Sequence, residues 1–279
     1  MIGLNFCPVN PWPIYLICRK VLILLHYFIA IKYFFISSIF LIGYFAYLGI
    51  SFLILSGANM INIHQIELTS RCNLRCQYCA HPTMGRAKQD MPVDVFRRAI
   101  RIAGQCVAQG WQNSINLAGI GESTMRDDLV DLLGIARAEV GPSCQIVLAT
   151  NGVVSSAALA AEFARLNIDV FVSLHRPEKA GKAIEFYRKA GVLRGVSADP
   201  SISATDWAGQ VDWHVSAQSG RCPWISGNWF FIASTGDVRQ CSFDARAEGS
   251  LGNIMSPGFD VNLLRGAPYT LCKTCHQIP

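Results

Sequence analysis

The sequence has no aspartate or glutamate before Glu67, and it has no concentrated run of lysine and arginine. Its formal net charge is +5. Three positive charges, on Arg19, Lys20 and Lys32, precede residue 60, which leaves 5 − 3 = +2 for the rest of the chain. Proteins that bind nucleic acid usually carry a clustered basic patch. We therefore expect no nucleic-acid partner, and a small molecule or a peptide as the substrate.

No cleavable signal peptide is apparent, and the sequence shows no internal repeat. The chain nevertheless contains 11 cysteines, most of which fall into spaced groups. In a reducing compartment, closely spaced thiols are more often metal ligands than disulfide partners. The cysteines therefore predict metal binding in a cytoplasmic protein.

Residues 33–55 form an uncharged apolar run that is long enough to cross a hydrocarbon core of about 30 Å. If this run is a single membrane span, its preceding positive charges place residues 60 onward outside the cytoplasm. That orientation conflicts with the metal chemistry described below. We therefore expect residues 1–59 to be a translated upstream segment and Met60 to be the start, with a membrane anchor as the alternative.

From residue 60 onward, predicted strands alternate with predicted helices. This alternation is typical of parallel βαβ units, here about six. Six units are too few for a complete eightfold barrel, so we expect residues 60–216 to form a partial TIM-like barrel of the α/β class. The strands are expected at residues 61–68, 114–118, 145–150, 168–174, 192–197 and 211–215, and the helices at 92–108, 126–138, 155–166 and 178–190.

A small second domain is expected at residues 217–279. Residues 229–233 and 238–242 flank the turn residues 234–237, and this pattern predicts a β-hairpin. The segment has too little apolar sequence to be stable alone, so a bound metal centre is a reasonable source of its stability.

Cys72, Cys76 and Cys79 form a C-x3-C-x2-C motif directly after the first predicted strand. In a β/α barrel, the loops at the carboxyl ends of the strands form the mouth of the active site, so these thiols are expected to face the substrate. Three thiolates leave one iron of a four-iron cluster open to a chelating ligand. A zinc site is the alternative interpretation.

This motif resembles the signature of the radical S-adenosylmethionine (radical SAM) superfamily, in which an aromatic residue, here Tyr78, precedes the third cysteine. The resemblance implies a [4Fe-4S] cluster chelated by SAM, with Tyr78 near the adenine. It also implies reductive cleavage of SAM to methionine and a 5′-deoxyadenosyl radical that abstracts a hydrogen atom from the substrate. An electron donor such as flavodoxin or ferredoxin is expected as a partner.

A second motif, Gly119-Ile120-Gly121-Glu122, follows the second predicted strand and resembles the family's Gly-Gly-Glu contact with the cofactor amino group, although Ile120 interrupts the glycine pair. Glycines allow a backbone to approach a ligand closely, but such a strand end is as often a tight turn. Ser173 ends the fourth predicted strand, where the family often places a ribose contact. A serine that caps a helix is the alternative there.

Four further cysteines, Cys222, Cys241, Cys272 and Cys275, make a C-x18-C pair and a later C-x2-C pair. Four thiolates can hold a structural zinc or a saturated [4Fe-4S] cluster, and their spacing does not choose between the two. The layout resembles the twitch module, a short form of the SPASM extension, which implies a second, auxiliary [4Fe-4S] cluster. The family most similar in this layout is 2-deoxy-scyllo-inosamine dehydrogenase.

The resemblance implies an oxidoreductase that dehydrogenates a small alcohol or sugar-like substrate, with the auxiliary cluster accepting an electron. A maturase that oxidises or crosslinks a ribosomal peptide is the second hypothesis, and a non-enzymatic iron–sulfur electron carrier is the third. The proton acceptor is unknown from the sequence. His175 and Arg176, just after the fourth predicted strand, face the expected active-site end of the barrel.

Overall fold

The computed structural model describes residues 60–197, 206–213 and 221–275. Residues 60–279 form one compact unit. The segment before Met60, about which the sequence raised the question of the start, lies outside the described residues. Within the described part, no helix is both long enough and apolar enough to cross a lipid bilayer.

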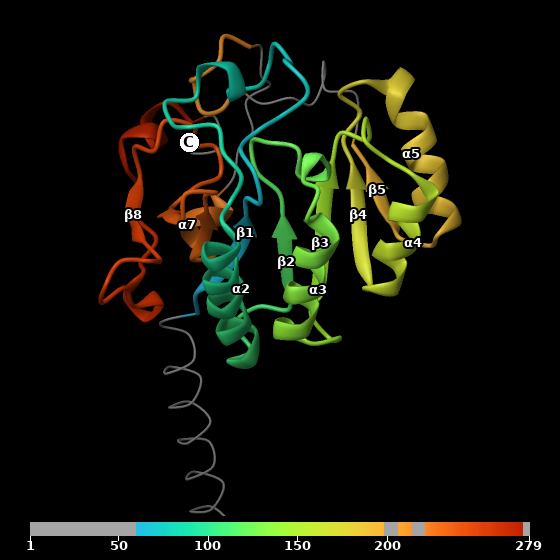
Figure 1. Ribbon diagram of the computed structural model, residues 1–279. Coiled ribbons are helices and arrows are strands. Elements are labelled where there is room, and N and C mark those ends of the chain that lie inside the picture. The colour runs from blue at the N-terminus through green and yellow to red at the C-terminus, as the bar shows by residue number, and fades with distance from the viewer. Residues whose placement is uncertain (1–59, 198–205, 214–220, 276–279) are drawn as a thin grey trace, which may run out of the picture. The chain divides into compact units, whose positions relative to one another are not determined.

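Eight strands form a single sheet in the order β5-β4-β3-β2-β1-β6-β7-β8. Strands β1 to β6 are parallel to one another, whereas β7 pairs antiparallel with β6 and β8 pairs antiparallel with β7. This open, mostly parallel sheet confirms the expected partial barrel of the α/β class (Figure 1). The strands are β1 (Asn62–Ile66), β2 (Ser114–Leu117), β3 (Gln145–Thr150), β4 (Ile168–Val172), β5 (Leu193–Val196), β6 (Trp229–Ile232), β7 (Asp237–Arg239) and β8 (Ser250–Asn253).

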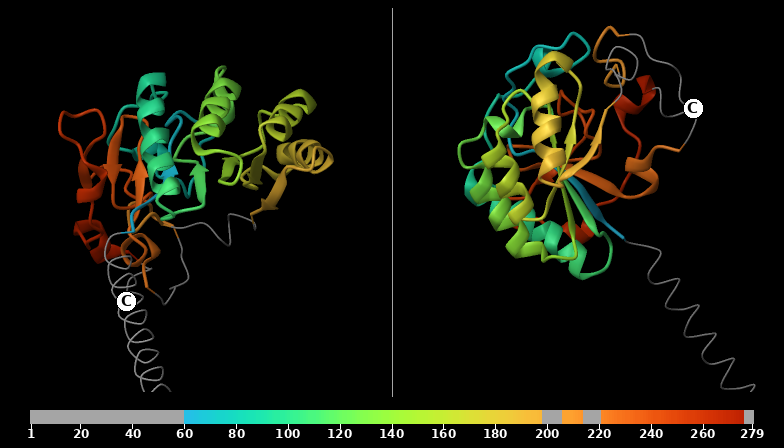
Figure 2. Two further views of the ribbon diagram at one scale, coloured as in Figure 1. Left: turned by 90° about the horizontal axis from the view of Figure 1, so that it is seen from below. Right: turned by 90° about the vertical axis from the view of Figure 1, so that its right-hand side faces the viewer.

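The main helices lie along one side of the curved sheet (Figure 2). Alternation along β3 shows the consequence, because Ile146, Leu148 and Thr150 are buried while the residues between them are partly exposed. The same period places Cys144 in the core just before β3, and Cys106 is buried in α2, as expected for small apolar side chains. The helices are α2 (Val93–Ala108), α3 (Leu129–Val140), α4 (Ala157–Arg165), α5 (Pro177–Lys189) and the short α7 (Pro223–Ser226).

Each helix buries an amphipathic stripe. In α2, buried residues recur at Phe96, Ala99, Ile100 and Ala103, which is the spacing of one helical face. Pro92 precedes this helix and Asp94 lies in its first turn, where an acidic side chain interacts favourably with the helix dipole. The apolar faces of the helices therefore pack on the sheet, and the loops at the carboxyl ends of the strands lie beyond them.

The strand predicted at residues 211–215 is wrong for its described part, since residues 211–213 form no strand. Their side chains pack against the loop after β1 instead. Val211 packs against the small cluster of Ala80, Met84 and Ile120, and the Trp213 ring meets the Tyr78 ring edge-on at 5.3 Å. Residues 214 and 215 lie outside the described residues. The sixth parallel strand is β6, which pairs with β1.

The β-hairpin predicted after residue 228 is confirmed as β6 and β7, and Gly236 adopts a φ of 85° in its turn. Strand β8, which the sequence did not predict, continues the same sheet. The expected boundary between residues 216 and 217 lies outside the described residues. In the described part, β6 of the tail pairs directly with β1 in the same sheet.

Candidate functional site

A cavity of about 300 Å³ opens at the carboxyl ends of the parallel strands. Loops after β1, β2, β3 and β4 supply its walls. The candidate residues of the first two motifs and Ser173 after the fourth strand all line this cavity: Cys72, Cys76, Tyr78, Cys79, Gly119, Gly121, Glu122 and Ser173. The sequence thus predicted which side chains meet, because parallel strands bring their carboxyl ends to one edge.

The three thiols of the first motif lie on the loop that follows β1. This loop folds back on itself, since the Cys79 amide donates to the Cys76 carbonyl at 3.1 Å. Burial raises the pKa of Cys79 to about 11 and also raises the pKa of Cys72. Without metal, Cys72 and Cys79 keep their protons at neutral pH, so metal binding must release these two protons.

Backbone amides already point at two of these sulfurs. The Leu74 amide donates to the Cys72 sulfur and the His81 amide donates to the Cys79 sulfur, each at 3.4 Å. Such donors stabilise a thiolate more than a thiol. The three sulfurs therefore share a cavity wall, lie beside backbone donors and leave open space in front of them, which fits a cluster with one iron free for a further ligand.

Glu122 is a buried carboxylate at the end of the loop after β2, and only 3% of it is exposed. One oxygen accepts hydrogen bonds from the Thr124 amide, the Thr124 hydroxyl and the Thr150 hydroxyl, at 3.1, 2.7 and 2.8 Å. The other accepts from the Asn151 amide at 2.6 Å. This network fixes the carboxylate between β2 and β3 while it still lines the cavity, where it can bind an ammonium group.

Gly121 and Gly119 leave no room for a side chain because neighbouring atoms lie against them, and neither has a positive φ. A Cβ at Gly121 would lie 2.3 Å from the carbonyl oxygen of Thr69 and 2.6 Å from that of Arg71. A Cβ at Gly119 would lie 2.4 Å from the side chain of Glu67. The two glycines therefore let the loop after β2 pack against the loop that carries the cysteines.

Tyr78, Ser173 and His175 face one another across the cavity. The Tyr78 hydroxyl lies 2.9 Å from Nδ1 of His175, and all three residues line the cavity wall. The N-cap position of α5 is Arg176, so Ser173 does not occupy the capping position that was the alternative for it. Burial lowers the pKa of His175, which keeps its ring uncharged at neutral pH. Arg176 does not line the cavity and lies 4.0 Å from Glu178.

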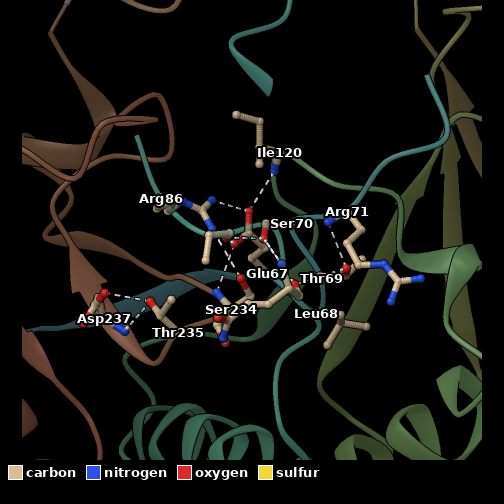
Figure 3. Close-up of polar contacts among 12 residues, drawn as sticks. Glu67, Leu68, Thr69, Ser70, Arg71, Arg86, Ile120, Ser234, Thr235 and Asp237 are labelled. Atoms are coloured by element: carbon tan, nitrogen blue, oxygen red, sulfur yellow. Dashed lines mark hydrogen bonds and ion pairs between the residues drawn. The ribbon is translucent and has the colours of Figure 1, made fainter. Parts of the chain in front are cut away.

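Glu67 is a structural residue that the sequence did not single out. Its fully buried carboxylate accepts hydrogen bonds from the Ile120 amide and the Ser234 amide, each at 3.0 Å, and pairs with Arg86 at 2.7 Å (Figure 3). These contacts join the end of β1, the loop after β2 and the turn of the β6–β7 hairpin. The only signal in the sequence was an acidic residue directly after an apolar strand, next to the cysteine motif.

The four later cysteines line a second, smaller cavity in the tail. Trp224, Ile225 and Leu271 supply its apolar walls. Burial raises the pKa of Cys241 to about 12, and the neighbouring Cys222 and Cys275 raise it further. Four thiols around one small cavity form a complete donor set. No set of three or more His, Cys, Asp or Glu side chains in the described ranges is spaced to hold a single metal ion.

Residues 66–219 match the sequence model of the Radical SAM superfamily. The chain is also 25% identical over 150 residues to the tungsten-containing aldehyde ferredoxin oxidoreductase cofactor-modifying protein of Pyrococcus furiosus, over 53% of this chain and 40% of that protein. The chain thus spans about two fifths of the length of this relative.

Two solved structures share the fold. BtrN in complex with AdoMet and 2-DOIA matches with a TM-score of 0.58 at 17% identity, over 70% of this chain and 78% of that chain. Native anSMEcpe with bound AdoMet matches with a TM-score of 0.53 at 15% identity, over 71% of this chain and 79% of that chain. Since the family match covers more than half of the sequence and includes the three-cysteine loop, the chain belongs to the radical SAM superfamily.

Proposed function

We propose that this radical SAM enzyme removes two electrons and two hydrogens from a small alcohol or sugar-like substrate, and that Cys222, Cys241, Cys272 and Cys275 hold an auxiliary [4Fe-4S] cluster. Membership of the superfamily implies a [4Fe-4S] cluster and SAM at the first cavity. There Cys72, Cys76 and Cys79 are the residues that would hold the cluster.

The observation that carries the proposal is the second, four-thiol cavity. A site with four protein ligands cannot bind substrate without losing one of them, so its natural role is electron transfer. An enzyme that both generates a substrate radical and contains an electron acceptor is equipped for oxidation. The structural neighbour BtrN, solved with AdoMet and 2-DOIA, supports a substrate other than a polypeptide.

When bound, the first cluster supplies the electron that cleaves SAM into methionine and a 5′-deoxyadenosyl radical, and a flavodoxin or ferredoxin is the proposed source of that electron. The chain's own residues bind and orient. Glu122 presents a fixed carboxylate to the amino group of SAM, and Tyr78 and Ser173 line the space for its nucleoside. The side chain of Trp207 also lines the cavity, and its indole donates to the Tyr78 carbonyl at 3.0 Å.

His175 is the best-placed proton acceptor for the oxidation. It lines the cavity, and burial lowers its pKa, so the ring is neutral at neutral pH. In the tautomer in which Nδ1–H donates to the Tyr78 hydroxyl, Nε2 carries the lone pair that can accept a proton. In such an oxidation, a hydrogen atom would leave the carbinol carbon and the hydroxyl proton would pass to this nitrogen. A cluster held by the four tail cysteines would supply the acceptor for the remaining electron. The product is the corresponding carbonyl compound, so atoms and electrons balance.

The test uses anaerobically reconstituted protein, a strong reductant and SAM. A panel of amino sugars and cyclitols, including 2-deoxy-scyllo-inosamine, is compared with a panel of cysteine- and serine-containing peptides. We expect the reconstituted wild-type protein to release 5′-deoxyadenosine with both panels. We expect a product lighter by two hydrogens only with a small alcohol. Cys76→Ala should abolish 5′-deoxyadenosine, whereas Cys241→Ala should retain it but lose the oxidised product. Oxidation of a peptide alone would contradict the proposal.

A further inference from the structure

The hydroxyl of Tyr269 is buried and has no hydrogen-bond partner among the described residues. Tyr269 lines the same small cavity as Cys222, Cys241, Cys272 and Cys275. It directly precedes the short helix η4 (Thr270–Thr274), which carries Cys272, and its amide donates to the Cys272 sulfur at 3.4 Å. Tyr269 thus lines the four-thiol site, and its buried hydroxyl is left without a partner among the described residues.

The ring of Tyr269 is held in place by close packing. A Cβ at Gly249 would lie 2.6 Å from this ring, so the glycine leaves the ring its space. Gly249 is itself fixed, because its amide donates to the buried carboxylate of Asp244 at 2.7 Å. The hydroxyl therefore cannot swing out to water without displacing the loop that holds Gly249.

A tyrosine hydroxyl is protonated at neutral pH and can donate one hydrogen bond. Buried donors in native proteins nearly always find an acceptor. No described protein group accepts this proton, while the sulfurs of a bound cluster are acceptors. Hydrogen bonds to cluster sulfurs are one of the main determinants of reduction potential, and a donor favours the more negative, reduced state.

We propose that the Tyr269 hydroxyl donates a hydrogen bond to a sulfur of the cluster held by the four tail cysteines and raises the reduction potential of that cluster. The inference rests on the proposed auxiliary cluster and adds a positioning residue that tunes it. A higher potential makes the cluster a better acceptor for the electron that the substrate radical must lose.

The chain offers a matched control in Tyr187. Its hydroxyl is also buried without a partner, but the residue lies in the main core, where its ring stacks on Phe163 with centroids 5.8 Å apart. It lines neither cysteine cavity. Tyr187→Phe therefore removes a buried, unpaired hydroxyl that is not at the four-thiol cavity, and any general effect of this substitution appears in both variants.

The experiment measures the reduction potential of the auxiliary cluster by redox titration followed by electron paramagnetic resonance. The full chain carries Cys76→Ala in every sample, so that the first cluster gives no signal. We expect Tyr269→Phe to lower the equilibrium constant for reduction of the cluster about tenfold, which lowers the reduction potential by about 59 mV for a one-electron couple. Tyr187→Phe should leave the potential unchanged. Equal potentials in the two variants would overturn the inference.

A second variant covers the case in which Tyr269→Phe fails to hold the cluster. Site-specific incorporation of 3-fluorotyrosine at position 269 keeps the ring and makes its hydroxyl a stronger donor, so the potential should rise. A potential that stays the same or falls would overturn the inference. A Cys76→Ala protein that binds no iron at all would overturn the proposed auxiliary cluster, and with it this inference. A protein that binds the cluster but shows no effect of position 269 on its potential would overturn this inference alone.

Discussion

The Tyr78 hydroxyl lies 2.9 Å from Nδ1 of His175, and this contact joins the cysteine loop to the segment after β4. Both residues line the first cavity, so the pair spans it from one wall to the other. The pair is separated by 97 positions in the sequence, and only the parallel order of β1 to β4 brings it together.

Removing this hydroxyl should weaken SAM binding. Tyr78→Phe keeps the ring but loses the hydrogen bond that fixes it to His175. Such a bond contributes about 0.5–1.5 kcal/mol, so if all of it serves to hold the cavity wall in its binding arrangement, the Kd for SAM rises by at most about tenfold. Calorimetric titration of reconstituted protein with SAM measures it. His175→Ala should have a similar effect, and the double variant should be no worse than either single variant, because both remove one interaction. Fully additive losses would show that the two side chains act separately.

The buried ion pair of Glu67 and Arg86 should dominate the stability of the cysteine loop. The side chains of Glu67 and Arg86 are 0% and 8% exposed. Arg86→Met leaves an uncompensated buried carboxylate, which typically costs about 3–5 kcal/mol of unfolding free energy. Urea denaturation of the metal-free protein measures this loss.

The control is the ion pair of Arg165 and Glu162, whose side chains are 61% and 41% exposed. Arg165→Met should change the free energy of unfolding by less than about 1 kcal/mol. If Arg86→Met were as mild as this control, the Glu67 network would not fasten the loop to the sheet.

Gly121→Ala should displace the cysteine loop. The new Cβ would collide with two carbonyl oxygens, of Thr69 and Arg71, and backbone atoms cannot move aside as a flexible side chain can. We expect loss of iron loading at the first site and a lower melting temperature. Gly134→Ala is the matched control, because a Cβ there meets nothing within 4 Å in the middle of α3. That control should be neutral or stabilised by up to about 1 kcal/mol, and its iron content should not change.

The sequence predicted the parts of the fold that depend on local patterns. The four main helices and five of the six predicted barrel strands occur where periodicity expected them, with ends shifted by a few residues. β3 matches its predicted bounds at Gln145 and Thr150. The candidate residues of the first site also meet as expected, because the βαβ rule brings the carboxyl ends of the parallel strands together.

The remaining features depend on tertiary contacts. Val211 and Trp213 have the apolar alternation of a strand but pack against the cysteine loop. Strand β8 is short and contains Gly252, so it has little strand propensity of its own and forms by pairing with β7. The importance of Glu67 lies in partners 19 to 167 positions away in the sequence, and no local pattern reports such distances.

His64 should make the stability of the protein depend on pH. Its ring stacks on the Trp229 ring, with centroids 4.0 Å apart, and burial lowers its pKa from the ordinary value of 6.5. Its other partners in the described part of the chain, Asn116 and Trp224, carry no charge. Above the ordinary pKa both the folded and the unfolded chain hold a neutral ring, so the full stability is present. As the pH falls through 6.5, the unfolded chain binds a proton that the folded chain does not, and stability is lost.

Urea denaturation of metal-free protein between pH 7.5 and 5 measures this dependence. His64→Gln removes the proton uptake but keeps a polar side chain that can still bond to Asn116. The wild-type slope should therefore exceed the slope of His64→Gln by up to one proton, or at most about 1.4 kcal/mol per pH unit. Parallel slopes would mean that His64 binds a proton in the folded protein as readily as in the unfolded chain. The stacking of its ring on Trp229 would then not disfavour the charged form.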